Sequence, residues 1–333
     1  MSAHATIVGT GSSVPKRILS NKQLESLVDT SDEWITRRTG IKERRISAPD
    51  GTETSSELAT QASLNALEMA GVSPLELDMI AVGTVTPDRQ FPSAACMVQE
   101  ALSADNAASF DVSAGCSGFL FALSMVDNAI RTGSCRNALV AGVERLSTIL
   151  DWQDRSTCVL LGDGAGAVVV SATTNSDGIL STHLKSNGKL WSLLYSTYRD
   201  SNPPEIVKGI DVKPFILKME GNRLFKKAVA CLTDISREAL ERNGLTTRDI
   251  RLVIPHQANL RIIQAVADNL EIPMDSVLTN VDKYGNTSSA SIPIALDEAN
   301  RKGLIHKGDI LLLVSFGAGL TWGAAIIKWS TGK

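Results

Sequence analysis

A cysteine flanked by small residues is the first candidate for covalent chemistry in this sequence. Cys116 lies in the segment DVSAGCSGFL (111–120), where a short apolar run is followed by an apolar residue at every third or fourth position up to Ile130. This pattern predicts a strand, a tight turn at the cysteine and then a helix. The positive end of a helix stabilises a thiolate, so we expect a lowered thiol pKa and a reactive nucleophile. A buried structural thiol is the alternative, and it is the preferred interpretation of the other four cysteines, Cys96, Cys135, Cys158 and Cys231.

Two other polar residues occupy positions that could assist this cysteine. His256 follows the apolar run LVIP (252–255), so it is predicted at the C-terminal end of a buried strand, where α/β proteins place their ligands. Asn286 stands in KYGNTSS (283–289), at a second predicted turn. A core histidine and a helix N-cap asparagine are the structural alternatives. If the three side chains meet, they predict acyl transfer through a thioester, and a thiol hydrolase is the competing interpretation.

The elements that must position these residues form a pattern that occurs twice. A helix that ends at glycine and leads into an apolar strand is predicted before Gly71 and again before Gly244. A second helix of this kind ends at Gly133 and its counterpart ends at Gly303. The separation between these two glycines equals the separation between Cys116 and Asn286. Short, almost continuously apolar strands between helices indicate parallel strands buried on both faces. We therefore predict an α/β fold of two similar halves; helix–strand alternation without duplication is the alternative.

Length and charge fit such a molecule and exclude several other classes. The chain of 333 residues suits two packed halves, which we place at 1–173 and 174–333, divided in the polar stretch ATTNSDG (172–178). Its 33 basic and 36 acidic residues give no overall attraction to nucleic acid or to anionic membranes. It has no export signal and no apolar run long enough to span a membrane, so we expect a cytoplasmic protein.

Neither a metal nor a nucleotide cofactor is expected. The five cysteines are widely spaced and form no CxxC pair, so they predict neither a zinc site nor a disulfide framework. The glycine-rich segments 162–167 and 316–323 lead into strands rather than helices, so they do not resemble phosphate-binding turns. Their backbone N–H groups could instead serve an oxyanion hole. A long stretch without clear period, 189–218, is expected to be an excursion from the fold with a functional role.

Several motifs in a fixed order resemble the ketoacyl-acyl-carrier-protein synthase III family of the thiolase superfamily. They cover nearly the whole chain: TSDEWI (30–35), RTGI (38–41), FPSAAC (91–96), the cysteine segment, GDGAG (162–166), PHQAN (255–259), GNTS (285–288) and FGAGLTWG (316–323). The resemblance implies the duplicated, five-layered αβαβα thiolase fold, usually as a homodimer. It also implies a decarboxylative Claisen condensation that joins an acyl-CoA to malonyl-acyl carrier protein and starts fatty acid synthesis. The thioester is a substrate in this reaction, and no cofactor is implied.

The resemblance further assigns roles to individual residues. Cys116 would carry the acyl group, the backbone N–H groups of Cys116 and Ala318 would hold the oxyanion, and His256 and Asn286 would hydrogen-bond the enolate that forms when CO2 leaves. Coenzyme A contacts are implied for Trp34, Arg38, Arg155, Asn259 and Arg261. Phe91 would close the acyl pocket of the partner subunit, and Arg223, Lys226, Lys227 and Arg261 would offer a basic surface to the carrier protein. A specialised condensing enzyme of secondary metabolism and a non-catalytic acyl-CoA-binding module are the alternatives.

Overall fold

Two β-sheets form the framework of the protein. The computed structural model describes residues 4–198 and 213–331. The first sheet has the strand order β1-β7-β6-β4-β5 and the second has the order β11-β12-β13-β8. The first comprises β1 (His4–Ser13), β4 (Met79–Gly83), β5 (Ala108–Val112), β6 (Asn137–Arg145) and β7 (Asp163–Thr173). The second comprises β8 (Gly178–Ser186), β11 (Ile250–Pro255), β12 (Ile310–Gly317) and β13 (Thr321–Lys328).

The expectation of parallel strands is only half right. In the first sheet β4 is parallel to β5 and β6, but β7 runs antiparallel to both β6 and β1. In the second sheet β11 and β12 are parallel, while β13 is antiparallel to β12 and β8. A strand buried on both faces has the same continuous apolar pattern in either direction, so the pattern could not distinguish the two.

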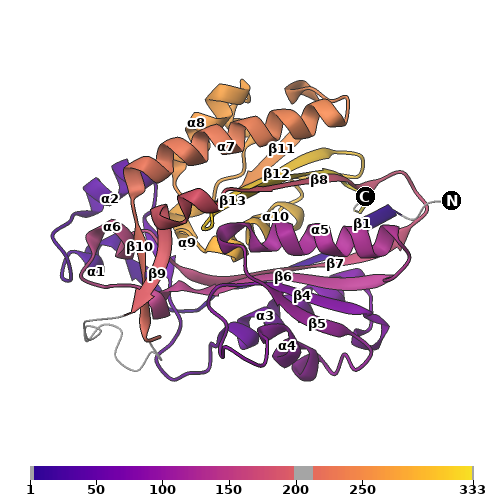
Figure 1. Ribbon diagram of the computed structural model, residues 1–333, viewed down its shortest axis with the longest axis horizontal. Coiled ribbons are helices and arrows are strands. Elements are labelled where there is room, and N and C mark those ends of the chain that lie inside the picture. The colour runs from indigo at the N-terminus through magenta and orange to yellow at the C-terminus, as the bar shows by residue number, and fades with distance from the viewer. Residues whose placement is uncertain (1–3, 199–212, 332–333) are drawn as a thin grey trace.

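Helices and sheets alternate in five layers, as Figure 1 shows. The helices α3 (Ser55–Ala70) and α4 (Ala94–Leu102) cover the outer face of the first sheet, and α7 (Gly221–Arg242) and α8 (Leu260–Leu270) cover that of the second. Between the sheets lie α5 (Gly118–Arg131) and α10 (Ser291–Arg301). Each interface has its own apolar core. The predicted αβαβα architecture is confirmed.

The repeated helix ends have the expected backbone geometry. Gly71, Gly133, Gly244 and Gly303 all have positive φ, between 64° and 76°, which glycine adopts without a Cβ penalty. In the structure these glycines follow α3, α5, α7 and α10, and each helix leads into a strand. The prediction of repeated helix–glycine–strand units is therefore confirmed at all four places.

Short elements complete the fold and lie mostly near one end of the molecule. They are α1 (Asn21–Leu24), α2 (Asp32–Thr39), α6 (Arg155–Cys158), α9 (Val281–Tyr284) and the two-stranded sheets β2 (Ile18–Ser20) with β3 (Glu43–Arg45) and β9 (Leu194–Tyr198) with β10 (Phe215–Met219). Single 3₁₀ turns precede α5, at Gly115–Ser117, and α10, at Ser288–Ala290. None of the helices in the described part of the chain is long and apolar enough to cross a membrane.

The expected irregular excursion at 189–218 is in fact partly regular. Its beginning is a 3₁₀ segment at Gly188–Leu193, and β9 and β10 then pair as an antiparallel ribbon. Residues 199–212 of the excursion lie outside the described residues. The strand pattern was not recognised in the sequence because β9 (LYSTY) is mostly exposed and polar in part, and the apolar residues of β10 (FILKM) form only a short run.

Candidate active site

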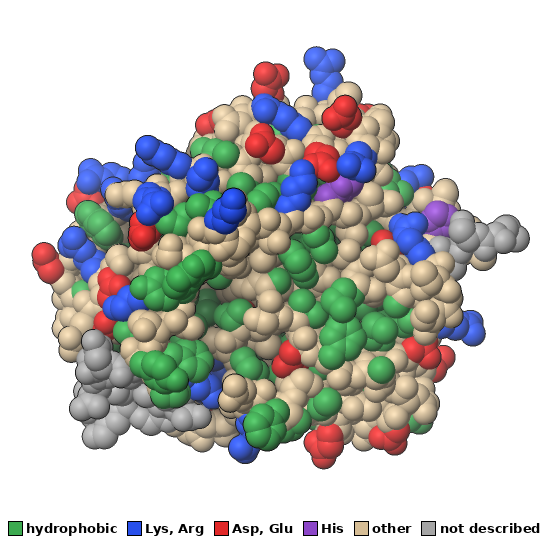
Figure 2. Space-filling view, viewed as in Figure 1, with side chains coloured by type: hydrophobic (Ala, Val, Ile, Leu, Met, Phe, Trp, Pro, Cys, Tyr) green, Lys and Arg blue, Asp and Glu red, His purple; other side chains and the backbone are tan. Residues whose placement is uncertain are grey.

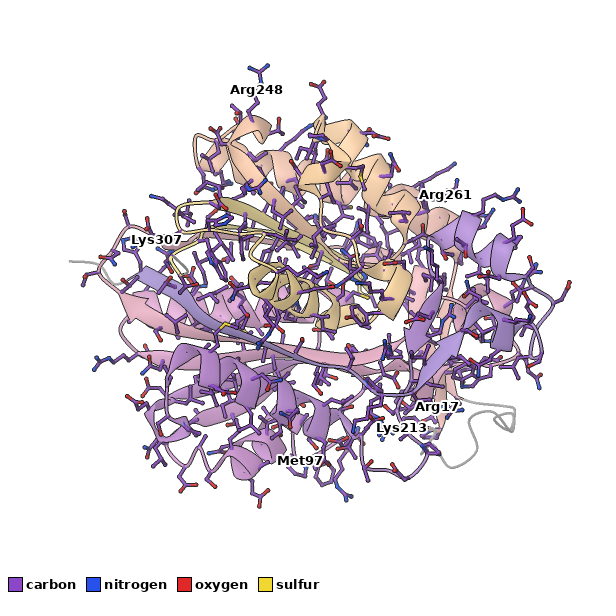
Figure 3. The ribbon with its side chains drawn as sticks, turned by 180° about the vertical axis from the view of Figure 1, so that it is seen from behind. Arg17, Met97, Lys213, Arg248, Arg261 and Lys307 are labelled. Carbon is purple, nitrogen blue, oxygen red and sulfur yellow. The ribbon has the colours of Figure 1, made fainter. Side chains whose placement is uncertain are left out.

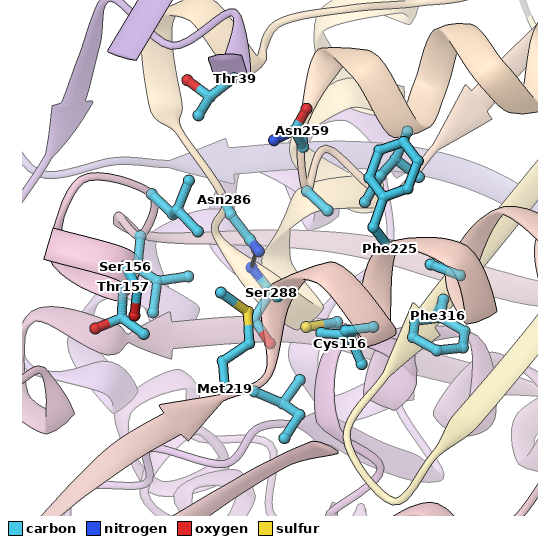
Figure 4. A pocket seen from close by; sticks show the side chains of 18 of the residues that line it. Thr39, Cys116, Ser156, Thr157, Met219, Phe225, Asn259, Asn286, Ser288 and Phe316 are labelled. Carbon is cyan, nitrogen blue, oxygen red and sulfur yellow. Dashed lines mark hydrogen bonds between the residues drawn. The ribbon is translucent and has the colours of Figure 1, made fainter. Parts of the chain in front are cut away.

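One pocket lies where the C-terminal ends of β5 and β11 face each other across the molecule. It has a volume of about 810 Å³, and its walls include Cys116, His256 and Asn286 together. Figure 4 shows the side chains of Cys116 and Asn286 directed into the same cavity, with Phe316 beside Cys116 and Phe225 farther along the cavity. The three residues that the sequence nominated from distant segments are thus brought to one place.

Cys116 lies in the 3₁₀ turn between β5 and α5, and the second sheet fixes this turn. The Ser117 hydroxyl donates to the carbonyl of Thr321 at 3.2 Å, and the Thr321 hydroxyl donates to the carbonyl of Ala114 at 2.7 Å. Thr321 is the first residue of β13. The hairpin between β12 and β13 therefore packs directly against the cysteine turn and holds it in place.

Two backbone N–H groups lie side by side where this turn meets the hairpin. A Cβ atom on Gly115 would come within 2.5 Å of the Ala318 nitrogen, and one on Gly317 would come within 2.4 Å of the Cys116 nitrogen. Contacts this short require glycine at both positions, and Gly115 also has a φ of +55°. Cys116 and Ala318, the two residues expected to form the oxyanion hole, both line the pocket.

His256 is held by its backbone at the end of β11. Its N–H donates to the carbonyl of Val314 at 2.8 Å, which extends the pairing of β11 with β12 by one residue. The next side chain, Gln257, is buried and donates to the carbonyls of Pro255 and Leu278 while its oxygen accepts from the N–H groups of Asn280 and Val281. This buried amide ties the end of β11 to the segment that leads to the asparagine turn.

Asn286 is fixed by both its backbone and its side chain. Its N–H donates to the carbonyl of Leu160 at 2.8 Å, and its carbonyl accepts from Gly162 at 3.0 Å. The side-chain oxygen accepts from the Ser288 N–H at 2.8 Å. This bond resembles the N-cap interaction that was the structural alternative, but it uses only the oxygen. Within residues 4–198 and 213–331, no hydrogen bond uses the hydrogens of the Asn286 amide NH₂.

Burial dominates the electrostatics of the site. Burial raises the pKa of the Cys116 thiol to about 12, although a hydrogen bond with the Ser288 side chain lowers it. The expected lowering of this pKa by the helix is therefore wrong, because desolvation of the thiolate outweighs the helix end. Burial lowers the pKa of His256 to about 4, so its imidazole is neutral near pH 7 and can donate a hydrogen bond. Its Nδ1 atom has no hydrogen-bond partner among the described residues.

Comparison with known proteins places this geometry in a family. Models of 3-oxoacyl-[acyl-carrier-protein] synthase III match residues 110–188, and models of its C-terminal part match residues 240–329. The beta-ketoacyl-[acyl-carrier-protein] synthase III of Caldanaerobacter subterraneus subsp. tengcongensis is 54% identical over 326 residues, which are 98% of each chain. The chain belongs to the beta-ketoacyl-[acyl-carrier-protein] synthase III family. It is accordingly an acyl-transferring condensing enzyme.

Solved structures agree with this assignment. The synthase III of Aquifex aeolicus VF5 superposes with a TM-score of 0.90 at 48% identity, covering 98% of this chain and 100% of that one. The priming beta-ketosynthase of the R1128 polyketide biosynthetic pathway also superposes with a TM-score of 0.90. The two sequences are 38% identical, and the match covers 100% of this chain and 98% of that one. The resemblance read from the motifs, including the thiolase-type fold, is confirmed.

The five residues expected to contact coenzyme A all line the same pocket. The guanidinium carbons of Arg38 and Arg155 lie 5.9 and 4.9 Å from the centre of the Trp34 ring. Asn259 caps α8 and donates weakly to the carbonyl of Arg38, which joins α8 to α2. Arg261 stacks over a phenylalanine ring, and Figure 3 shows it on the side of the molecule where α2 lies.

The residues expected to dock the carrier protein and to close the acyl pocket do not all line the pocket. Lys226 lines the pocket, whereas Arg223 and Lys227 lie outside it, and Arg223 is paired with Glu220 at 2.8 Å. Figure 2 shows Lys and Arg side chains gathered over α2 and the N-terminal end of α7, beside a hollow bordered by hydrophobic side chains. Phe91 is 81% exposed and does not line the pocket of its own chain.

Two polar residues of the site were missed from the sequence. Ser288 lines the pocket beside Cys116, and its hydroxyl donates to the buried carboxylate of Glu144 at 3.1 Å. The available signal for Glu144 was a charged residue closing the otherwise apolar run ALVAGV (138–143). The ribbon residues Leu194, Leu217 and Met219 also line the pocket. No cluster of three or more metal-ligating side chains occurs among the described residues.

Proposed function

We propose that the pocket performs the condensation in two half-reactions, with Cys116 as the acyl carrier. In the first, the sulfur attacks the carbonyl of an acyl-CoA, the N–H groups of Cys116 and Ala318 hold the oxyanion, and coenzyme A leaves. The observation that carries this proposal is the convergence of Cys116, His256 and Asn286 on one pocket, which Trp34 and two arginines stacked with it also line.

The second half-reaction uses the two neutral side chains. Malonyl-acyl carrier protein loses CO2, and His256 and the Asn286 amide donate hydrogen bonds to the thioester oxygen as enolate charge develops. The carbanion then attacks the acyl-Cys116 carbonyl and releases a β-ketoacyl thioester. Each positioned donor of this kind is worth about 3 kcal/mol of the barrier. The low pKa of the buried His256 supports this role, because a neutral imidazole is already a donor without taking a proton.

Coenzyme A is proposed to enter past Trp34. The adenine would stack on this indole, with Arg38, Arg155 and Arg261 near its phosphates and Asn259 along the pantetheine arm. Cationic and aromatic groups suit an anionic, planar nucleotide. The thioester is consumed as a substrate, so the proposed reaction needs neither a redox cofactor nor a metal.

We further propose a homodimer that works in the cytoplasm with an acidic carrier protein. The exposure of Phe91 supports a contact with a second copy, whose acyl pocket this ring would close. Lys226 and Arg261 at the pocket, with Arg223 and Lys227 beside it, would receive the carrier protein. Of these cations Arg223 is already paired with Glu220, so we expect it to contribute least.

Incubation with a panel of acyl-CoAs tests the proposed priming role. The mass of the peptide that contains Cys116 should rise by one acetyl group with acetyl-CoA, and CO2 should be released only when malonyl-acyl carrier protein is added. A related priming beta-ketosynthase of a polyketide pathway makes a secondary-metabolic role the second candidate. Adducts from longer or aromatic acyl-CoAs, without one from acetyl-CoA, would favour that candidate and contradict the priming role.

A further inference from the structure

A buried carboxylate stands behind the nucleophile without a role in the chemistry described so far. Glu144 ends β6 and is fully buried. Four groups donate to it: the hydroxyls of Thr84 at 3.4 Å, Thr86 at 2.5 Å and Ser288 at 3.1 Å, and the N–H of Val85 at 3.2 Å. Within the described part of the chain, no lysine, arginine or histidine forms a salt bridge with Glu144. Hydroxyl and amide donors alone thus hold this carboxylate in place.

Ser288 connects this carboxylate to Cys116. Its hydroxyl has one proton, which it donates to Glu144, so toward the cysteine the oxygen can only accept. Once a thiolate has formed and the carboxylate has taken up a proton, the Ser288 hydroxyl can donate to the sulfur instead, and a bond of this kind lowers the pKa of Cys116. Ser288 also has a φ of +48°, which is unusual for a residue with a side chain, and Asn286 holds its N–H. The Ser288 hydroxyl thus binds the carboxylate from a residue that lines the same pocket as Cys116.

We infer that Glu144 acts through Ser288 as the proton acceptor that generates the Cys116 thiolate. As the S–H proton passes to the Ser288 oxygen, the Ser288 proton passes to Glu144, and the sulfur attacks the thioester. The new S–C bond forms as the bond between the acyl carbon and coenzyme A breaks. The departing CoA thiolate takes the proton back through Ser288, which restores the carboxylate before condensation. This assignment deepens the proposed function and rests on it.

Burial makes Glu144 a better acceptor than His256. Burial raises the pKa of Glu144 to about 7, whereas burial lowers that of His256 to about 4. A thiol whose own pKa is raised to about 12 needs such an acceptor, because very little of it ionises spontaneously near pH 7. Glu144 is a positioning residue in this scheme, since it touches Ser288 and not the substrate.

A purely electrostatic role for Glu144 predicts the opposite effect of the same substitution. The negative charge of Glu144 by itself raises the pKa of Cys116. Replacing it with the neutral glutamine should therefore make the cysteine more reactive if the carboxylate is only a nearby charge. If it is the proton acceptor, the same replacement should make the cysteine less reactive. The sign of the change distinguishes the two.

The experiment measures alkylation of the intact enzyme by iodoacetamide, peptide by peptide, and Cys116 acylation by acetyl-CoA in a single turnover. Glu144→Gln and Ser288→Ala should each slow Cys116 acylation by about 100-fold. They should also slow its alkylation, while Cys231 in the same digest reacts as in the wild type. The double variant should be no slower than either single variant by more than about twofold, because both interrupt one path. In the wild type, the acylation rate should fall as pH drops below about 7, and this dependence should vanish in Glu144→Gln.

Asp163→Asn is the matched control. Asp163 is equally buried, accepts only from backbone N–H groups and hydroxyls of Ser47 and Ser147, and does not line the pocket. Its substitution should leave the Cys116 rates unchanged in the folded fraction. Faster or unchanged alkylation in Glu144→Gln, or an equal loss in Asp163→Asn, would overturn the inference. If alkylation follows the expected pattern but no acyl-CoA ever acylates the wild type, the proposed function fails while the proton path stands.

Discussion

Gly115 and Ala318 face each other so closely that a Cβ on the glycine would lie 2.5 Å from the alanine nitrogen and 3.1 Å from its Cβ. These two residues bring the N–H groups of the cysteine turn and of the β12–β13 hairpin to the same edge of the pocket. Because Gly115 has no side chain, the Ala318 backbone and its methyl group can pack against it. The geometry of the proposed oxyanion hole thus depends on a pair of residues that are far apart in the sequence.

Gly115→Ala should lower the acylation rate of Cys116 by about 100-fold, because it displaces a proposed oxyanion donor. Adding Ala318→Gly should restore part of the loss, since the smaller residue lets the hairpin yield. Gly133→Ala is the control, because Gly133 also has positive φ but a Cβ there meets nothing within 4 Å. It should cost about 1 kcal/mol of folding stability and leave the rate unchanged. Equal rates for Gly115→Ala and wild type would remove the steric argument.

Asn286→Asp should separate the two half-reactions. The carboxylate can still accept the Ser288 N–H, so the turn should keep its shape, but it has no hydrogen to donate to an enolate. We expect near-normal acylation of Cys116 and a condensation step about 100-fold slower. Rapid-quench measurements of both steps check this. An equal loss in both steps would mean that Asn286 only shapes the turn.

His256→Gln should change how stability depends on pH. Burial lowers the pKa of His256 to about 4 from 6.5, so the unfolded chain binds its proton more tightly than the folded one. The free energy of unfolding contributed by this residue is therefore lost as pH falls from 6.5 toward 4, by an amount on the order of 3 kcal/mol. The pKa of Glu144 is shifted in the opposite direction, so its effect on stability is present in both proteins. The informative quantity is therefore the difference in the free energy of unfolding between variant and wild type, measured by urea titration at each pH in this range. Parallel pH profiles for the two proteins would contradict a neutral buried imidazole.

Trp34→Ala should weaken recognition of coenzyme A and leave the chemistry intact. Loss of the ring that stacks with Arg38 and Arg155 should raise KM for acetyl-CoA about tenfold. The rate with a short acyl thioester that lacks the nucleotide should stay within about twofold of the wild type. Trp191→Ala is the matched control, because Trp191 is 59% exposed and does not line the pocket. An equal loss of activity with acetyl-CoA and with the short thioester would mean that Trp34 supports the structure of the site and does not bind the nucleotide.

Much of the fold could be predicted because its elements have local signals. Glycines that end helices, as at Gly71 and Gly244, and buried apolar strands such as β12 are visible in a single sequence. The antiparallel direction of β7 and β13 was not, since it depends on which strand lies beside which. The ribbon β9–β10 was missed because β9 is mostly exposed and the apolar run of β10 is only three residues long.

The residues of the site likewise include some that could be predicted from the sequence and some that could not. Cys116, His256 and Asn286 each follow a strand or a turn, so their positions could be inferred before their contacts were known. Glu144 gave only a weak signal, because one charged residue at the end of a buried strand is compatible with many roles until its partners are known. The raised pKa of Cys116 also could not be predicted, since burial depends on side chains from both ends of the chain.

The most direct test of the account isolates the enzyme after one turnover with labelled acetyl-CoA and then adds malonyl-acyl carrier protein. The account predicts that the label first resides on the peptide containing Cys116. It then leaves that peptide and appears in a β-ketoacyl product, with one CO2 released for each label transferred. Label that is released as free acetate, or product formed while the label stays on the protein, would contradict an acyl-Cys116 intermediate in condensation.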